Sequence, residues 1–352
     1  MDYRLIADEH LPLSRKSVLP GEGFFISEAD RERERASRVA SALDEHDVLV
    51  LTDADADGLS AAATIRAVEG DAAVLPTSPH EFHRLLDRIA EEATDVVTVY
   101  VCDLVPDATE DVEDALAEFG TTDVSVTWFD HHQWPPAIAD AVRNAGIELV
   151  IGDGEAECTA DVAVRQLPDV PDHLATLAAV TRDHDLWIKE DPRSDDIADF
   201  AYWTDAEDFV ETVLEYGVEL PSGALDLLAE RREEKAVLIG YAIDRGRYVD
   251  VGEWTVGVTY GRCSQNEVAE AMREEGADAA VIVKPAGSAS IRGSSTFERC
   301  HEVAAQVGGG GHPRAAGCKP PIYDDMLDYA RHWVTEGAVA QQVILDAFER
   351  LD

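Results

Sequence analysis

Carboxylate and imidazole side chains gather at four places in the first half of the chain, each at the end of an apolar or helical segment. The four groups are Asp53-Ala54-Asp55-Ala56-Asp57-Gly58, Asp103, Asp130-His131-His132 and Asp183-His184-Asp185. If the fold brings them together, their like charges repel, and the usual compensation is a bound cation. Oxygen and imidazole ligands without thiolates suit Mn²⁺ or Mg²⁺ better than structural zinc.

The number of candidate ligands indicates more than one ion. Five or more ligands exceed a single tetrahedral site, and two metals about 3.5–4 Å apart form the geometry that enzymes use for phosphoryl displacement. Taken alone, the first group could be a calcium loop. The EF-hand pattern, however, needs Glu at its twelfth position, and counting from Asp53 that position is Thr64. Asp-His-His alone could be a capping turn, but four such groups together favour a metal site.

The elements that would position these groups follow a parallel α/β pattern, because apolar runs alternate with helical patterns. We predict strands over 47–52, 96–101, 124–129 and 148–151, and helices over 27–46, 60–68 and 172–182. Ligands of an open parallel sheet bind beyond the carboxyl ends of its strands. The acidic and histidine groups are therefore expected to line one crevice.

The second half of the chain predicts a separate α/β unit after an acidic helical stretch. Its expected strands are 254–260, 279–284 and 289–293, with helices over 264–275 and 298–307 and a closing helix near the C-terminus. The predicted fold class is therefore two-domain α/β. A parallel-sheet catalytic domain spans 1–190, a helical connector 191–245, and a smaller mixed α/β substrate-binding domain 246–352.

A locally basic segment in this second unit predicts phosphate binding. Residues 279–320 hold five bases against two acids, in a chain of formal net charge −43. Glycines allow close backbone approach and offer N–H donors, and Arg adds charged donors. The candidate substrate-binding residues are Arg292, Gly309, Gly310, Gly311, His312 and Arg314. The alternatives are a glycine linker and, for Arg292, a solvated sheet face.

As a set, these motifs resemble those of the DHH phosphoesterase superfamily. The four acidic and histidine groups look like its four motifs, and Gly309-Gly310-Gly311-His312 resembles the GGGH signature of the DHH-associated C-terminal domain. The superfamily includes RecJ-type exonucleases, oligoribonucleases of the NrnA and NrnB kinds, and cyclic-dinucleotide phosphodiesterases. The resemblance extends from about residue 47 to residue 320.

The resemblance implies a site with two Mn²⁺ ions per chain, or Mg²⁺ in their place. Asp55 and Asp57 would each hold one ion and Asp103 would bridge the two. His131 and Asp183 would complete the second site. His132 would face the scissile phosphate, so that the catalytic residues are Asp103, His131 and His132.

Two positions depart from the pattern or compete for a role. Many members carry a His where this chain has Leu51, and Asp53 would then be a ligand or support one. Asp185 competes with Asp183 in the fourth motif. We predict Asp183, because Trp187 then falls where relatives carry an aromatic residue.

The resemblance implies a hydrolase, namely a Mn²⁺-dependent phosphoesterase or exonuclease that acts by a two-metal mechanism. Its expected substrates are phosphodiester or phosphomonoester bonds of short single-stranded RNA or DNA, or of small nucleotides. A long phosphate track would meet repulsion outside the basic segment. Two alternatives stay open: a non-catalytic nucleic-acid-binding module related to RecJ at the replication fork, and an inorganic pyrophosphatase.

Composition predicts a cytoplasmic protein without a membrane partner. No apolar run reaches the length of a membrane span, and the acidic start over residues 1–8 is unlike a signal peptide. The five cysteines form no CxxC pair and no disulfide framework. A homodimer is one oligomeric state compatible with these features.

The charge balance resembles that of cytoplasmic proteins of extreme halophiles. Asp and Glu number 72 against 29 Lys and Arg, and self-repulsion of this size destabilises a compact chain unless salt screens it. A polyanion mimic or a binder of basic partners is the alternative. Dispersed acids, rather than an acidic block, favour the halophile interpretation.

This interpretation predicts that salt stabilises the fold. The melting temperature should rise as KCl is increased towards molar concentrations, because screening relieves the repulsion between acids. Differential scanning calorimetry over a KCl series measures it. A melting temperature that is constant or falls over the series would contradict the prediction.

Overall fold

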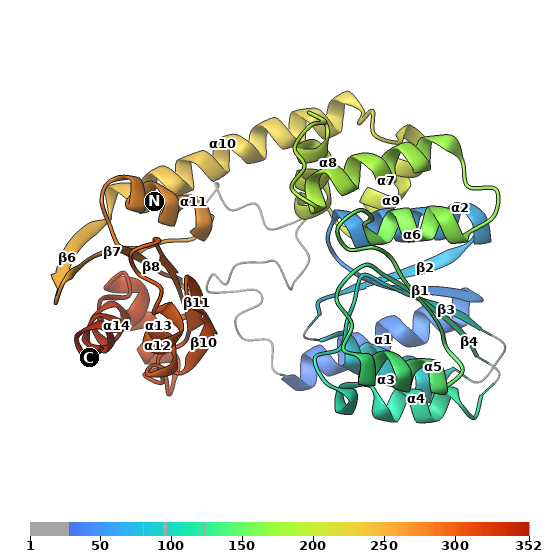
Figure 1. The fold of residues 1–352 in the computed structure, drawn as a ribbon, viewed down its shortest axis with the longest axis horizontal. Helices are drawn as coiled ribbons and strands as arrows, with labels where there is room; N and C mark the ends of the chain where they lie inside the picture. The colour runs from blue at the N-terminus through green and yellow to red at the C-terminus, as the bar shows by residue number, and fades with distance from the viewer. Residues whose placement is uncertain (1–27, 80, 94–96, 123, 352) are drawn as a thin grey trace. The chain divides into compact units, whose positions relative to one another are not determined.

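The computed structural model describes residues 28–79, 81–93, 97–122 and 124–351, without the side chains of residues 28–30 and 326. The expected acidic N-terminal segment and the first residue of the predicted helix 27–46 lie outside this range. The described chain forms two compact units, residues 28–228 and 229–351, each with its own sheet (Figure 1). This confirms the predicted two-domain α/β class. The units divide within α10 (Ser222–Asp244).

The sheet of the first unit has five parallel strands in the order β2-β1-β3-β4-β5. Their bounds are β1 Val48–Asp53, β2 Ala72–Thr77, β3 Thr98–Cys102, β4 Ser125–Asp130 and β5 Glu148–Ile151. This is the doubly wound order in which the chain leaves β1 towards one edge and returns to its other side. The strands are largely buried, as expected for a sheet covered on both faces.

Helices cover the two faces of this sheet (Figure 1). Each face has its own apolar core. One layer holds α1 Glu28–Glu45, α3 Phe82–Glu92, α4 Glu113–Phe119 and α5 Pro136–Asn144, with a 3₁₀ turn at Thr109–Asp111. The other holds α2 Ala56–Glu69, α6 Thr159–Gln166, α7 Asp172–Asp185, α8 Ser194–Trp203 and α9 Ala206–Tyr216. Alternation along the strands explains the two cores: Leu49 and Leu51 face the first layer and Val50 the second.

Two local features of this unit differ from the sequence predictions. Strand β2 was not predicted, because its alanines and Pro76 have low strand propensity; it lies at the sheet edge, where proline is tolerated. Helix α2 begins at Ala56 rather than Ser60, because the Asp55 side chain accepts N–H groups of its first turn. The earlier start places Asp57 inside the helix.

The sheet of the second unit is mixed, with the order β10-β11-β9-β8-β7-β6. The bounds are β6 Arg247–Val251, β7 Trp254–Tyr260, β8 Ala279–Val283, β9 Ala289–Gly293, β10 Gly309–His312 and β11 Ala315–Cys318. Of these described strands, β7 and β8 pair in parallel, across α11 Gln265–Glu274, and the other neighbours are antiparallel. Apolar residues of α11 and α10 pack on one face of the sheet, and those of α12 Cys300–Ala305 and α14 Ala338–Glu349 pack on the other.

The glycine segment of this unit is a strand rather than a flexible linker. Gly309–His312 forms β10, which pairs with β11 at the sheet edge. Glycine has low intrinsic strand propensity, so pairing with β11 supplies what the sequence pattern lacks. The predicted closing helix is two helices, α13 Met326–Val334 and α14. None of the described helices is long and apolar enough to cross a membrane.

The contact between α2 and the end of β1 leaves no room for a side chain at Gly58. A Cβ there would lie 2.5 Å from both the Asp53 carbonyl oxygen and Thr52 Oγ1. Gly58→Ala should therefore cost about 1–3 kcal/mol through overpacking, and lower the melting temperature by roughly 2–12 °C. Thermal unfolding followed by circular dichroism measures this.

Gly223→Ala is the matched control for this substitution. Gly223 lies in the first turn of α10, and a Cβ there meets nothing within 4 Å. Because alanine is the better helix former, this variant should unfold at the wild-type temperature or slightly above it. Equal losses in the two variants would mean that packing against β1 is not the cause.

Candidate metal centre and phosphate-binding face

The predicted acidic groups of the first unit converge where β1 and β3 lie side by side. Asp53 ends β1 and Asp103 follows β3, while the chain between them passes through β2 on the other side of β1. This is the switch point of a doubly wound sheet, where strand connections diverge and ligands bind. The ends of β4 and α7 add Asp130, His131 and Asp185.

Asp57 is a buried carboxylate held by backbone donors. Its residue is 1% exposed. Its two oxygens accept the backbone N–H groups of Thr159 at 2.7 Å and Ala160 at 2.8 Å, at the start of α6. Asp55 precedes it as the N-cap of α2 and accepts the N–H groups of Asp57 and Gly58, both at 3.0 Å. Two helix N-termini thus meet the carboxylates, which favours negative charge.

Asp103 occupies a strained turn directly after β3. Its φ is 61°, in the left-handed region that non-glycine residues seldom adopt. Its N–H donates to the Phe129 carbonyl at 3.0 Å, and its carboxylate accepts the Thr159 hydroxyl at 3.0 Å. Such backbone strain is retained where the surrounding structure fixes it and is common at functional sites.

His131 lies at the centre of the carboxylates. Its Nε2 is 3.4 Å from Asp185 Oδ2 and 3.7 Å from both Asp57 Oδ2 and Asp103 Oδ1. The residue is 8% exposed. One imidazole nitrogen therefore shares a small volume with three acidic side chains.

His132 is oriented by a buried acid. Its Nδ1 lies 2.9 Å from Asp130 Oδ1 and 3.5 Å from Asp103 Oδ1, while about half of its side chain is exposed. The hydrogen bond to Asp130 raises the pKa of His132, against the opposing effect of burial. The ring is thus fixed through Nδ1, and Nε2 is left for other contacts.

Burial and like charge raise the pKa values of the clustered acids. Burial is the largest cause for Asp57, followed by the charges of Asp185 and Asp55, and raises its pKa to about 8. Burial and then Asp57 hold the pKa of Asp103 well above its usual range. Burial also raises the pKa of Asp185, although His131 and His132 act in the opposite direction. A cluster of this kind binds either protons or cations.

The donor geometry fits divalent metal ions. Three overlapping groups have ligand atoms within 4.8 Å of one another: Asp53-Asp55-Asp103, Asp57-His131-Asp185 and Asp103-His131-His132. Asp130 Oδ2, His131 Nδ1, Asp183 Oδ2 and Asp185 Oδ2 are buried and have no hydrogen-bond partner among the described residues. Carboxylate and imidazole donors without thiolate suit Mn²⁺ and Mg²⁺.

The fourth motif places two acids, Asp183 and Asp185, in the last turn of α7. Asp185 belongs to one of the three groups found among the described residues, and Asp183 belongs to none of them. Asp183 Oδ1 accepts the Glu190 N–H at 2.8 Å. Burial raises the Asp183 pKa, but hydrogen bonds from Glu190, Ser194 and Asp191 outweigh it and lower the pKa overall. Asp183 thus holds the following turn, and the geometry favours Asp185 as the ligand.

Thr159 is a site residue that the sequence analysis missed. Its N–H and its hydroxyl bind two different acids, Asp57 and Asp103, and the residue is fully buried. It stands at the start of α6, outside the acidic motifs. A threonine beginning a helix after the fourth predicted strand is the only sequence signal that pointed to it.

In the second unit, two of the predicted phosphate-binding residues lie on one face of the sheet. Arg292 of β9 pairs with Ala315 of β11, which in turn pairs with His312 of β10. Directly paired residues share a face, so Arg292 and His312 flank a small alanine. The Arg292 Nε donates to Asn266 Oδ1 at 2.9 Å, which fixes the guanidinium.

The three glycines of β10 have different reasons to be glycine. A Cβ at Gly309 would lie 2.1 Å from the Gly317 carbonyl oxygen, and one at Gly311, whose φ is 141°, 2.6 Å from that of Ala315. Strand packing therefore requires glycine at both positions. A Cβ at Gly310 would meet nothing within 4 Å, and Gly310 shares the face of His312. Open backbone for a ligand therefore exists at Gly310.

Several bases of the segment contact other groups of the unit. Arg299 pairs with Glu302 at 2.7 Å, and the Lys319 ammonium lies 5.5 Å from the Tyr329 ring centroid. Burial, and then the charge of Arg292, lower the pKa of Lys284. Arg314 is exposed in the turn between β10 and β11. Arg314 is therefore an exposed cation next to this sheet. Arg292 shares the face of His312, while its Nη1 also donates to the carbonyls of Ile291 at 3.1 Å and Ala316 at 3.2 Å.

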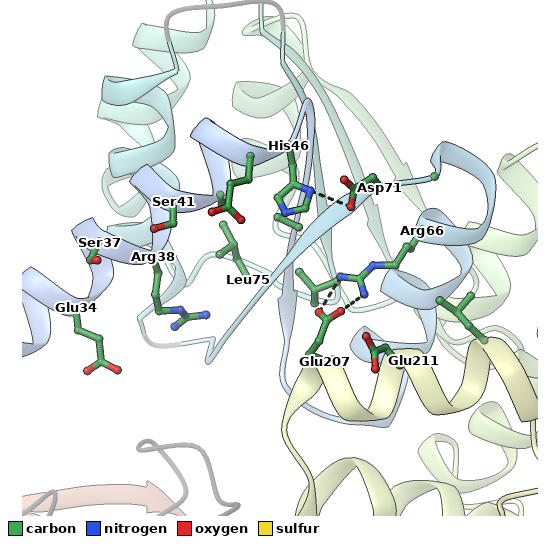
Figure 2. A pocket seen from close by; sticks show the side chains of 16 residues that line it. Glu34, Ser37, Arg38, Ser41, His46, Arg66, Asp71, Leu75, Glu207 and Glu211 are labelled. Atoms are coloured by element: carbon green, nitrogen blue, oxygen red, sulfur yellow. Dashed lines mark hydrogen bonds and ion pairs between the residues drawn. The ribbon is translucent and has the colours of Figure 1, made fainter.

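A cavity of about 800 Å³ in the first unit is a separate feature (Figure 2). It lies along edge strand β2 between α1 and α9, and none of the acidic cluster lines it. Arg66 pairs with Glu207 and His46 with Asp71. Arg66 also donates to the Ala72 carbonyl and Arg38 to that of Pro76. These contacts protect the strand edge from further pairing.

Comparison with solved structures defines the class of fold. No protein-family model and no curated protein matches the chain. It resembles the DHH domain of a member of the s1p family of ribosomal proteins, with 14% identity, 96% of each chain covered and a TM-score of 0.56. It also resembles exonuclease RecJ bound to manganese, with 17% identity, 97% of each chain covered and a TM-score of 0.53.

A third similar structure is RecJ from Thermus thermophilus in complex with Mn²⁺. The identity is 20% and the TM-score 0.51, with 96% of this chain and 56% of that chain covered. The protein is thus a two-domain α/β protein with an acidic and histidine cluster at a sheet switch point. More particularly, it has the fold of the DHH-domain proteins, as the motif resemblance predicted.

The arrangement of the fourth motif predicts different metal affinities for two neighbouring substitutions. Asp185→Asn removes a charge 3.4 Å from His131 Nε2 and should weaken Mn²⁺ binding by about 10- to 100-fold or more. Asp183→Asn keeps an oxygen that accepts the Glu190 N–H, so Mn²⁺ affinity should stay within a few-fold of wild type. Isothermal titration calorimetry with Mn²⁺ measures both. A larger loss in Asp183→Asn would restore the original assignment.

Proposed function

We propose that the protein is a metal-dependent phosphoesterase that hydrolyses phosphodiester or phosphomonoester bonds of short single-stranded oligonucleotides or small nucleotides. The observation that supports this most is the overlap of three candidate metal groups, with Asp103 and His131 each belonging to two of them. Shared ligands of this kind suit two adjacent ions. Inorganic pyrophosphatase activity and a non-catalytic binding role are tested below.

In this proposal, the buried acids hold two Mn²⁺ ions, or Mg²⁺. Asp53, Asp55 and Asp103 would surround one ion, and Asp57, His131 and Asp185 would surround the other. Asp103 would lie near both ions, because its Oδ1 is 3.7 Å from His131 Nε2. Ions held there would stabilise negative charge on phosphate oxygens during hydrolysis. The choice of Mn²⁺ is supported by the similar RecJ structures, which were determined with that ion.

His132 and Thr159 have roles that do not depend on holding an ion. Asp130 fixes the His132 ring through Nδ1, so Nε2 can face a phosphate oxygen from a half-exposed side chain. The raised pKa of His132 favours the protonated ring, which can donate a hydrogen bond to that oxygen. Thr159 orients Asp57 and Asp103 by hydrogen bonds.

We further propose that the second unit binds the nucleotide phosphates. Arg292, held by Asn266, and exposed Arg314 supply charged donors, and Gly310 and His312 supply an open backbone and an imidazole on the face that Arg292 shares. Phosphate oxygens are the ligands that such an arrangement recognises. Short substrates are favoured because the net charge of −43 repels a long phosphate track. Cytoplasmic location, adaptation to high salt and a homodimer stay predictions.

The experiment that tests the proposal compares the wild-type chain with Asp103→Asn. The substrates are a dinucleotide, a 5-mer oligonucleotide, 3′-phosphoadenosine phosphate, cyclic di-AMP and pyrophosphate, each with Mn²⁺ and with Mg²⁺. Hydrolysis of at least one nucleotide substrate is expected. Asp103→Asn should reduce it by about 10²–10³-fold, because a charge in contact with the reacting centre is lost.

Stability provides the control. Asp103→Asn removes one of several buried like charges, so the metal-free variant should melt at or above the wild-type temperature. Turnover of pyrophosphate alone would favour the pyrophosphatase. Binding of an oligonucleotide without turnover under any of these conditions would favour the binding module, and normal turnover by Asp103→Asn would contradict the site assignment.

A further inference from the structure

Trp187 is the most exposed large apolar side chain of the first unit among the described residues, at 78%. Tryptophan is usually well buried; Trp128 and Trp203 of this unit are 0% and 8% exposed. An exposed indole forgoes the free energy that burial would contribute. The exposure of Trp187 therefore indicates a functional role.

The turn that carries Trp187 is held in place by the backbone and by Asp183. Trp187 and Lys189 have φ values of 56° and 60°, both in a region that costs conformational energy. The Asp183 carbonyl accepts the N–H groups of Ile188 at 2.9 Å and Lys189 at 3.2 Å, and its carboxylate accepts that of Glu190. The turn thus presents the indole outward in a defined conformation.

The indole has two neighbouring side chains among the described residues, His184 and Lys189. The His184 ring stacks on it with a centroid distance of 6.3 Å, and Lys189 Nζ lies 5.0 Å from the ring centroid. His184 Nδ1 and Lys189 Nζ are 3.0 Å apart, and both contact Asp195. Two groups so close together occupy the same side of the ring. With the side chain 78% exposed, the opposite side faces solvent.

The turn that carries Trp187 directly follows the acidic cluster in sequence. Asp185, which is 3.4 Å from His131 Nε2, precedes Trp187 by two residues, so their Cα atoms are at most about 7.6 Å apart. Lys189 brings one of the five lysines of this acidic chain to the same turn. The flat aromatic surface suits the base of a nucleotide, and the neighbouring cation and candidate metal site suit its phosphate.

We propose that the open face of Trp187 stacks on the nucleobase of the nucleotide whose phosphate ester is bound at the acidic cluster. This rests on the proposed function and specifies its substrate class: nucleotides with an unpaired base, bound with little preference among bases. Every base offers a π-face, so stacking tolerates any sequence, whereas a base inside a duplex is covered on both sides.

The test separates the base from the phosphate ester. A dinucleotide is compared with its abasic counterpart, in which both bases are replaced by hydrogen, for the wild-type chain, Trp187→Ala and Trp187→Phe. Trp187→Ala should lower kcat/KM for the dinucleotide by roughly 5- to 100-fold, mainly through KM, and leave the abasic substrate unchanged. Trp187→Phe should keep most of the activity. Tyr216→Ala, which removes an exposed aromatic side chain of α9, is the matched control and should behave as wild type.

A binding measurement keeps the inference testable apart from catalysis. Adding AMP should quench the part of the tryptophan fluorescence that the wild-type chain has and Trp187→Phe lacks. If the wild-type chain hydrolyses neither substrate but AMP quenches Trp187, the proposed function fails and the base site stands. Equal losses on both substrates in Trp187→Ala, or no quenching of Trp187 by AMP, would overturn the inference and leave the proposed function intact.

Discussion

The burial of several carboxylates in one small volume is the constraint on which the first unit depends. Asp57 and Asp103 are 1% and 3% exposed, and burial together with like charge raises their pKa values. Two features of the fold offset part of the free-energy cost of burying these charges. The N-termini of α2 and α6 point backbone N–H groups at the acids, and Thr159 adds its hydroxyl. The remaining charge is what suits the cluster to divalent cations.

The sheet topology explains why these acids meet at all. Residues 53 and 103 are distant in sequence, but β1 and β3 are neighbours because the chain turns aside through β2. Thr52 pairs with Cys102, so the two strands end level with each other. The left-handed turn at Asp103 then directs its carboxylate towards Thr159 rather than along the strand. Topology brings the residues together, and local backbone geometry aims them.

The sequence predictions were accurate where the side chains strongly prefer one kind of secondary structure. The strands 148–151, 254–260 and 289–293 agree with β5, β7 and β9 to the residue, since apolar and β-branched residues dominate β5 and β7. The predictions failed at the edge strands β2, β6 and β10 and at β11 beside β10, which contain alanine, charged residues or glycine and form because a neighbour offers hydrogen bonds. The choice between Asp183 and Asp185 depended on a backbone N–H supplied by Glu190, which no spacing rule contains.

These differences divide the motif residues into two kinds. Asp183, Gly309 and Gly311 are needed by the backbone: the first accepts N–H groups of a tight turn, and the other two lie against the neighbouring strand. Asp185, His131 and Gly310 have atoms or space that the fold itself leaves unused. Asp183 belongs to both kinds, because its Oδ1 accepts the Glu190 N–H while its buried Oδ2 has no partner among the described residues. A motif therefore identifies a site without identifying which of its residues touch the ligand. That distinction follows from hydrogen bonds and packing, because a residue fully engaged by its own chain has little left to offer a substrate or an ion.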